Sequence, residues 1–162
     1  MSIKMSVAAL AEFLDKTFPQ VAHDFVIERV TDDGITVRLK VADRHLRPGA
    51  TVSGPTMFAL ADVSIYLAIL SRIGPQELAV TTNASIDFMR KPDANTDLIA
   101  QCSLLKLGRL LAVGDVLIYS QDKTQPVARA SMTYALPVDS NRSGAVPERD
   151  AEPTQRVKYG VL

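Results

Sequence analysis

Residues 55–73 read Pro-Thr-Met-Phe-Ala-Leu-Ala-Asp-Val-Ser-Ile-Tyr-Leu-Ala-Ile-Leu-Ser-Arg-Ile, and the predicted architecture follows from this segment. Pro55 suits the first turn of a helix because its missing N–H would have no helical partner there. Gly74 and Pro75 follow the stretch and predict where the helix ends. The predicted helix is apolar on every face, so it must be wrapped by other structure and cannot lie on a surface.

The segments on either side of this helix predict six strands. Two precede it, at Asp24–Val30 and Ile35–Val41, joined by a turn in which Gly34 supplies a positive φ. Four follow it, at Leu78–Met89, Asp97–Leu107, Leu110–Ser120 and Val127–Leu136. The sequence therefore predicts an α+β fold in which a six-stranded antiparallel sheet is wrapped around a central hydrophobic helix. This arrangement buries the concave face of the sheet and every face of the helix.

The remaining segments complete one domain. An apolar stripe over residues 6–18 predicts an amphipathic helix that ends at Pro19, so residues 1–20 hold an N-terminal helix and residues 1–137 form the domain. The polar residues 138–162 predict a C-terminal tail that is flexible unless a partner chain holds it. Leu110–Ile118 is apolar on both faces of its strand, which indicates a central strand covered on both sides or a strand at a subunit contact.

The composition excludes several classes of protein. The 162 residues carry 18 basic and 18 acidic side chains, so the basic excess typical of nucleic-acid binders is missing. The single cysteine, Cys102, excludes an intrachain disulfide, and with only His23 and His45 a three-histidine metal centre is impossible. We expect Cys102 to be a buried, inert thiol and His45 to be a solvated loop residue.

The apolar runs are too short or too interrupted for targeting or membrane insertion. Met57–Leu70 contains Asp62 and falls short of the ~20 residues that cross a bilayer. The N-terminal run carries Glu12 and lacks the cleavage site of a secretory signal. We therefore expect a cytoplasmic protein that does not bind membranes. Together with the composition, this also predicts a protein that needs no metal or other cofactor and binds no nucleic acid.

Asp62 needs an explanation because it interrupts an otherwise apolar helix. Burying an ionised carboxylate costs several kcal/mol unless it is paired, hydrogen-bonded or protonated. One interpretation is a structural aspartate bonded to backbone N–H groups of a neighbouring loop. The other is a carboxylate held near a ligand as a nucleophile or base.

The loop before the helix favours the second interpretation. Residues 47–55 deliver the chain to a helix N-terminus, where free N–H groups and the positive end of the helix dipole stabilise an anion. The oxyanion formed when a carbonyl is attacked is such an anion. Gly54 lies eight residues before Asp62, about two turns away, and we expect a carbonyl to fit between them.

Residues 52–62 resemble the helix-entry motif of hotdog-fold acyl-CoA thioesterases, in the phenylacetate-pathway (PaaI-like) branch. That motif reads His-Gly-Gly, six residues, then Asp, and Ser53-Gly54-Pro55 and Asp62 fall at these spacings. Residues 84–92 are similar to the strand of this family that ends in Phe-x-x-Pro, with one residue extra. Residues 106–109 are similar to its Lys-x-Gly-Arg turn, and Val127-Ala128 and Thr133-Tyr134 match its last strand.

The resemblance implies a function and a set of site residues. Asp62 takes the position of the nucleophile or general base that cleaves an acyl-CoA thioester, the Gly54 N–H that of the oxyanion donor, and Thr81 that of a hydroxyl that positions water. Ser53 stands at the motif histidine. The coenzyme A and acyl groups would contact Arg47, Met57, Phe58, Tyr66, Arg90, Lys91 and Arg109. Coenzyme A is then part of the substrate, and the site lies between the subunits of a homodimer or of a tetramer made of two dimers.

The departures from the motif leave alternatives. Ser53 replaces the histidine, Pro55 the second glycine, and Arg47 stands where the family often has asparagine. A non-catalytic acyl-CoA binding or sensing protein of the same fold is therefore the alternative to a thioesterase. A hotdog hydratase ranks last, because its proton transfer needs a histidine paired with the acid and neither histidine lies in such a motif.

Overall fold

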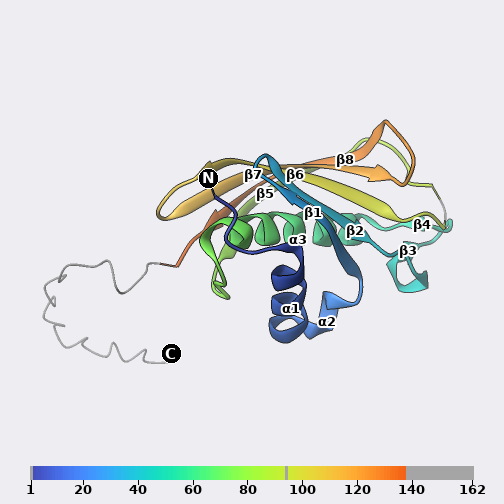
Figure 1. Cartoon of the computed structure of the whole chain (residues 1–162). Helices are drawn as coiled ribbons and strands as arrows, with labels where there is room; N and C mark the ends of the chain where they lie inside the picture. The colour runs from blue at the N-terminus through green and yellow to red at the C-terminus, as the bar shows by residue number, and fades with distance from the viewer. Residues whose placement is uncertain (1, 94, 138–162) are drawn as a thin grey trace, which may run out of the picture.

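A long helix lies in the hollow of a curved antiparallel sheet in the computed structural model, which describes residues 2–93 and 95–137 (Figure 1). The sheet has the strand order β1-β2-β6-β7-β8-β5, and every neighbouring pair is antiparallel. Its strands are β1 (Phe25–Thr31), β2 (Gly34–Leu39), β5 (Val80–Phe88), β6 (Leu98–Leu107), β7 (Leu111–Ser120) and β8 (Pro126–Ala135). The α+β architecture and all six strands are confirmed. The predicted tail at 138–162 lies outside the described residues.

The central helix α3 (Gly54–Ile73) begins and ends where local chemistry dictates. Ser53 is the N-cap, and its Oγ accepts the Thr56 N–H at 3.3 Å. Gly74 ends the helix with φ 95°, a conformation that side chains with a Cβ adopt at a cost, and its N–H bonds the Leu70 carbonyl. The helix therefore has a defined start and a defined end.

Burial of α3 explains its apolar sequence. Twelve of its twenty residues are buried, and it packs chiefly against β6, β2 and β7. By length and composition alone α3 would suit a membrane span, but most of it is enclosed by the domain. The prediction that every face is wrapped is too broad, because Pro55, Phe58 and Ala59 are exposed and Asp62 and Tyr66 are half-buried. One stripe of the core helix is thus left uncovered.

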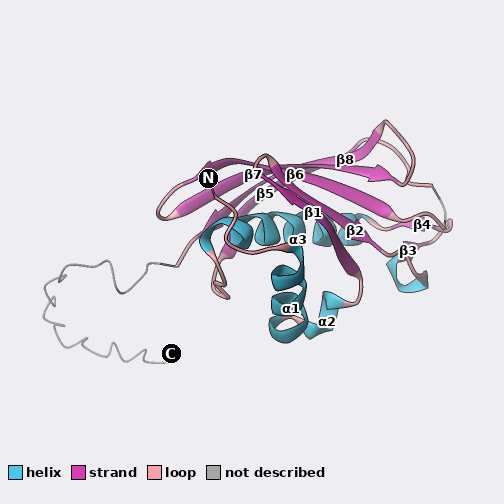
Figure 2. Ribbon diagram, in the orientation of Figure 1, coloured by secondary structure: helices cyan, strands magenta, loops and turns pink. Residues whose placement is uncertain are grey.

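The N-terminal helices lie below α3, on the side away from the sheet (Figure 2). Helix α1 (Val7–Thr17) is capped by Ser6 and buries Leu10 and Leu14. Pro19 ends α1 as predicted, but it also begins a second short helix, α2 (Pro19–Ala22), because proline fits the first turn of a helix as well as it stops one.

The segment predicted as an irregular loop holds a small ribbon. A single 3₁₀ turn, η1 (Asp43–His45), leads into β3 (Leu46–Arg47), which pairs with β4 (Thr51–Val52). The turn between β1 and β2 also differs from expectation, since Gly34 has no positive φ. A Cβ at position 34 would lie 1.9 Å from the Cys102 carbonyl oxygen, so the glycine is needed for the close approach of β2 to β6.

The two faces and two edges of the sheet are covered unequally. The concave side of β7 packs on α3, while Leu111 and Leu117 on its convex side stay exposed, so the chain itself covers only one face. Strand β5 is a sheet edge, and its residues are exposed except for half-buried Ile86. A nine-residue edge with free N–H and C=O groups is a template for another strand.

Candidate active site

Asp62 is held by two hydroxyl groups from the sheet. Thr81 Oγ1 on β5 donates to Asp62 Oδ1 at 2.5 Å, and Tyr134 Oη on β8 lies 2.6 Å from the same oxygen. Among the described residues Oδ2 has no hydrogen-bond partner. The carboxylate is therefore fixed through one oxygen and leaves the other free, and its partners are side chains, not the loop backbone of the structural interpretation.

Thr81 and Tyr134 meet because β5 and β8 pair there. The two residues stand directly opposite each other in the ladder, and the register shifts between Thr81 and Asn83. Such a bulge re-aims a side chain and is common beside active sites. Burial, followed by the negative charge of Asp62, raises the pKa of Tyr134, so its hydroxyl remains a donor.

Asp62 lines a pocket of about 320 Å³. Its walls come from the start of β5, from α3 and from the end of α1, and comprise Thr17, Phe18, Asp62, Val63, Tyr66, Glu77, Ala79, Val80, Thr81 and Tyr134. Tyr66, predicted to contact the acyl group, lies here, and burial followed by the charge of Glu77 raises the pKa of its phenol. The pocket is chiefly apolar, and its two acidic side chains are those of Asp62 and Glu77.

The Gly54 N–H lies at the other end of the uncovered stripe. Pro55 has no N–H, the Thr56 N–H is bonded to Ser53 Oγ and the Met57 N–H to the Ser53 carbonyl. Within residues 2–93 and 95–137 no acceptor bonds the Gly54 N–H. This donor is thus available to an anion at the positive end of a 20-residue helix.

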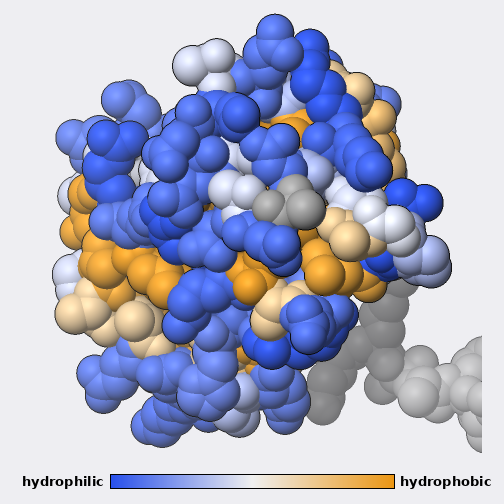
Figure 3. Space-filling model, turned by 90° about the vertical axis from the view of Figure 1, so that its right-hand side faces the viewer, coloured by the Kyte–Doolittle hydropathy of each residue, from blue (hydrophilic) through white to orange (hydrophobic). Residues whose placement is uncertain are grey.

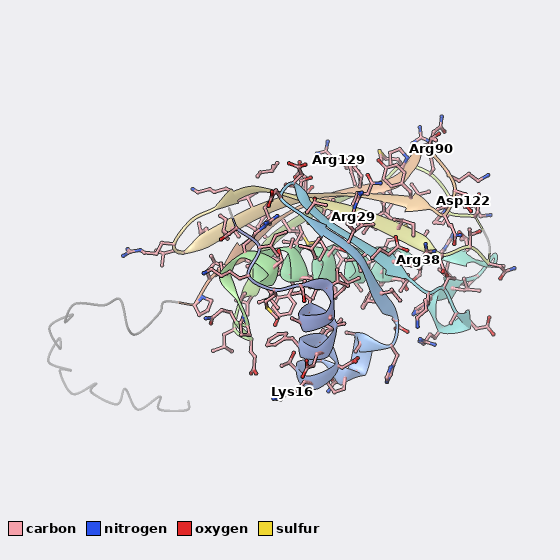
Figure 4. All side chains as sticks on the ribbon, viewed as in Figure 1. Lys16, Arg29, Arg38, Arg90, Asp122 and Arg129 are labelled. Carbon is pink, nitrogen blue, oxygen red and sulfur yellow. The ribbon has the colours of Figure 1, made fainter. Side chains whose placement is uncertain are left out.

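A second, separate groove of about 450 Å³ surrounds Gly54. Its lining combines apolar side chains with three cations and comprises Arg47, Thr51, Val52, Gly54, Met57, Phe88, Met89, Arg90, Lys91 and Pro92. Figure 3 shows this end of the molecule, where hydrophilic side chains surround smaller hydrophobic areas, and Figure 4 places Arg90 at the same end of the sheet. Phe88 lies over Gly54, with its Cζ 3.2 Å from where a Cβ would stand. The predicted residues Arg47, Met57, Arg90 and Lys91 thus come together.

The two sites are too far apart in one chain to act on one carbonyl. Gly54 and Asp62 stand eight residues apart on the same helix, which corresponds to about 12 Å along its axis. A carbonyl group within hydrogen-bond distance of both would need the two groups to lie only about 6–7 Å apart. The expectation that a carbonyl fits between Gly54 and Asp62 of a single chain is therefore wrong.

Two other predicted site residues lie elsewhere. Arg109 is in the β6–β7 turn, at the Tyr134 end of the sheet, whereas Arg90 follows Phe88 at the opposite end. Phe58 is partly exposed on α3 and lines neither the pocket nor the groove. A single chain does not bring these residues to Arg47, Arg90 and Lys91.

His45 is buried, which corrects the prediction of a solvated side chain. Its Nδ1 accepts the Ala42 N–H at 3.0 Å, and Nε2 lies 3.1 Å from Asp24 Oδ2. Because Nδ1 accepts a hydrogen bond, it carries no proton, so the ring is neutral and its Nε2–H is the donor. Burial, followed by the charge of Arg44, lowers the pKa of His45 and favours this neutral form. His45 is therefore a structural residue of the turn before α3.

Cys102 is buried as expected. Burial, followed by the nearby charge of Asp115, raises the pKa of its thiol to about 12. Nor do three or more His, Cys, Asp or Glu side chains of the described ranges cluster in a way that would hold a metal ion.

Tyr134 is the site residue that sequence reasoning missed. The Thr133-Tyr134 pair was noted only as part of the last strand, where a tyrosine alternating with apolar residues is typical of a core position. The available signal was its hydroxyl, because a buried tyrosine hydroxyl needs a hydrogen-bond partner and Asp62 was the one unexplained acceptor in the core.

A six-stranded antiparallel sheet wrapped around one apolar helix, with an aspartate two turns into that helix, defines a hotdog fold with a thioesterase-type helix motif. The chain belongs to the Thioesterase superfamily, whose family model matches residues 49–127. A Pseudomonas aeruginosa protein named "putative esterase" is 30% identical over 104 residues, which cover 64% of this chain and 75% of that protein.

Solved structures agree with this assignment. A "putative thioesterase" from Silicibacter sp. TM1040 is 54% identical, with a TM-score of 0.79 over 85% of this chain and 95% of that one. The phenylacetic acid degradation protein PaaI from Thermus thermophilus is 26% identical, with a TM-score of 0.63 and coverage of 74% and 99%. A hypothetical thioesterase from Streptococcus pneumoniae, solved with coenzyme A, is 25% identical, with a TM-score of 0.62 and coverage of 69% and 87%. The predicted family is confirmed.

Proposed function

We propose that this protein is an acyl-CoA thioesterase that hydrolyses the thioester to a free acid and coenzyme A. The observation that carries the proposal is the Asp62 carboxylate, which Thr81 and Tyr134 fix through Oδ1 and which lines a chiefly apolar pocket. A carboxylate placed in this way can activate water or attack a carbonyl carbon directly.

The working unit of the proposal is a homodimer joined through β5. Antiparallel pairing of β5 with its copy places the Thr81 end of one strand beside the Phe88 end of the other. Asp62 is bonded to Thr81, and Phe88 lies over Gly54. Asp62 of one protomer therefore approaches Gly54 of its partner, which removes the separation of about 12 Å within one chain. A tetramer would add a second such dimer.

In this arrangement the chemistry needs only the residues already described. Water activated by Asp62 Oδ2, or Oδ2 itself, attacks the thioester carbon, and the charge on the carbonyl oxygen is stabilised by the Gly54 N–H of the other protomer. A simple thiol has a pKa of about 8.5, so the leaving thiolate needs little help from an acid.

The cationic groove supports coenzyme A as the carrier of the acyl group. Arg47, Arg90 and Lys91 line it together with apolar side chains, and no carboxylate of the described chain does. Phosphate groups favour such cation clusters, and the nucleotide and pantetheine parts favour the apolar surface beside them. Arg109 of the partner would lie at the same end in the antiparallel dimer. The related Streptococcus pneumoniae protein was solved with coenzyme A.

The Asp62 pocket then receives the acyl group. Phe18, Val63, Tyr66 and Val80 give it apolar walls suited to an aromatic or medium aliphatic chain. The proposed site needs no resident metal or organic cofactor, and we expect the enzyme to act in the cytoplasm.

A second candidate, a non-catalytic acyl-CoA binding or sensing protein, is favoured by Ser53. Ser53 stands where the family has a histidine, and its hydroxyl is engaged by the Thr56 N–H and lies 2.9 Å from Thr56 Oγ1. The side chain serves the helix cap, so the role of the histidine has no replacement at this position.

The experiment that separates the candidates measures thiol release from short, long and aromatic acyl-CoAs with a coloured thiol reagent. We expect release by the wild type and a loss of about 100-fold or more in Asp62→Asn, with acyl-CoA affinity largely kept. Equal rates in both proteins would contradict the role of Asp62. Saturable binding by calorimetry without any release would identify a binding protein.

A further inference from the structure

Tyr134 makes two close approaches to Asp62, and the proposed chemistry uses only the one to the carboxylate. Its Oη lies 2.6 Å from Asp62 Oδ1 and 2.9 Å from the Asp62 main-chain oxygen. The ring is buried, with 2% of its surface exposed, and its register on β8 is fixed by pairing with Thr81 and Ala112 on the two neighbouring strands. The hydroxyl therefore stands at one place relative to α3.

A tyrosine hydroxyl has one hydrogen and can donate to only one of these acceptors at a time. While Asp62 is ionised, the charged Oδ1 is the better acceptor, because hydrogen bonds to charged groups are shorter and stronger. The main-chain oxygen is a second acceptor that the same hydrogen reaches by rotation about the C–O bond. Tyr134 thus keeps a partner whether or not the carboxylate is charged.

We propose that Tyr134 is a positioning residue for catalysis, which holds Oδ1 so that Oδ2 is the reacting oxygen and releases Oδ1 when the charge of the carboxylate is consumed. The inference rests on the proposed thioesterase function. Thr81 alone, on an exposed edge strand, gives the carboxylate one bond about which it can turn. The bond from Tyr134 removes that freedom.

The reaction step conserves atoms and charge. Water oxygen bonds to the thioester carbon, one water proton moves to Asp62 Oδ2, and the carbonyl π electrons move to the oxygen at the Gly54 N–H of the other protomer. Collapse of this intermediate breaks the carbon–sulfur bond and expels the thiolate. The Tyr134 proton stays on Tyr134 throughout and only changes acceptor, from Oδ1 to the Asp62 main-chain oxygen.

The test compares Tyr134→Phe with the wild type and with Tyr119→Phe. Tyr119 on β7 is a matched control, since it is a half-buried strand tyrosine outside the Asp62 pocket. We expect kcat of Tyr134→Phe to fall about 10-fold or more with KM within about 2-fold, because the lost hydrogen bond is to a charged group that reacts. Tyr119→Phe keeps the wild-type kcat. A wild-type kcat in Tyr134→Phe would overturn the proposal.

A second variant separates a positioning role of Tyr134 from a packing role. It also keeps the proposal testable if Tyr134→Phe folds poorly. Replacement of Tyr134 by 4-aminophenylalanine returns an N–H donor at the same place, and we expect it to restore kcat to within about 3-fold of the wild type. A kcat that stays as low as in Tyr134→Phe would mean that only the packing of the phenol matters, which contradicts the proposal.

Failure of the proposed function has a different signature. If the wild type releases no thiol from any acyl-CoA, the thioesterase function is wrong, and crystal structures of the wild type and Tyr134→Phe then decide the positioning role. We expect the Asp62 carboxylate to turn away from its wild-type orientation in the variant. An unchanged orientation would refute the role of Tyr134 independently of activity.

Discussion

Thr81 Oγ1 lies 2.5 Å from Asp62 Oδ1, and this bond joins the exposed edge of the sheet to the middle of the core helix. The only acidic side chain of α3 is thereby anchored at the boundary of the domain, where another chain can approach. Through the same contact, the pairing of the β5 edge with another chain can affect the chemistry of Asp62.

The first prediction concerns this bond. Thr81→Val keeps the shape of the side chain but removes the donor to Asp62 Oδ1, so we expect thioester turnover to fall about 10-fold with little change in thermal stability. Thr82→Val is the matched control, because Thr82 bonds the Thr133 carbonyl and not Asp62. Steady-state kinetics and thermal unfolding of both variants check the prediction. Equal losses in the two variants would mean that Thr81 acts only through the strand.

The second prediction concerns the cationic groove. Arg90→Glu with Lys91→Glu places negative charge beside the phosphates of coenzyme A, so we expect KM for an acyl-CoA to rise about 10-fold or more at low salt, and less at high salt. Lys16→Glu on α1 is the control, since Lys16 lies far from Arg90 (Figure 4). An unchanged KM in the groove variant would remove the groove from the coenzyme A site.

The third prediction concerns the free edge. Ser85 lies mid-strand in β5, so in an antiparallel pair of β5 strands two copies of residue 85 come close. Ser85→Arg then sets like charges against each other, and we expect the dimer to dissociate and turnover to fall with it. Gln20→Arg, at an exposed position of α2, adds the same charge and leaves the assembly intact. Light scattering after size-exclusion chromatography measures the mass, and a dimer that survives Ser85→Arg would argue for another interface.

The fourth prediction concerns His45 and pH. Its pKa is lowered in the folded protein, below the value of about 6.5 for an unfolded chain. As pH falls below about 6.5 the unfolded chain therefore takes up a proton before the folded one does, and the free energy of unfolding decreases. We expect His45→Asn to remove part of this acid sensitivity. Denaturant unfolding at several pH values on both sides of this point measures the effect, and identical pH slopes in the wild type and in His45→Asn would contradict the assignment.

Periodicity predicted the strands and the core helix because long elements repeat their pattern many times. The β3–β4 ribbon was missed, since strands of two residues have no period to detect. Gly34 was assigned a turn conformation, but the constraint is the carbonyl of Cys102, on a strand far along the sequence. Contacts between distant segments are not encoded in any local pattern.

The candidate site divides in the same way. Asp62 and Gly54 were identified because each departs from its local context. Asp62 is a charged residue in an apolar helix, and Gly54 is a glycine at the start of that helix. Tyr134 does not depart from its local context, because aromatic residues are common in strands. Only the pairing of β5 with β8 therefore reveals what its hydroxyl contacts. The spacing of Gly54 and Asp62 was correctly noted but wrongly converted into a distance between reacting groups.

The geometry of the core helix fixes the distance and the angle between Gly54 and Asp62. Each residue of an α-helix advances the chain by about 1.5 Å and turns it by about 100°, so the offset between the Gly54 N–H and Asp62 is set by the backbone and not by the side chains around it. One residue inserted between them would swing Asp62 away from Thr81 while leaving the apolar character of α3 intact. The walls of the acyl pocket can therefore change from one relative to another, but the length of this helical segment cannot.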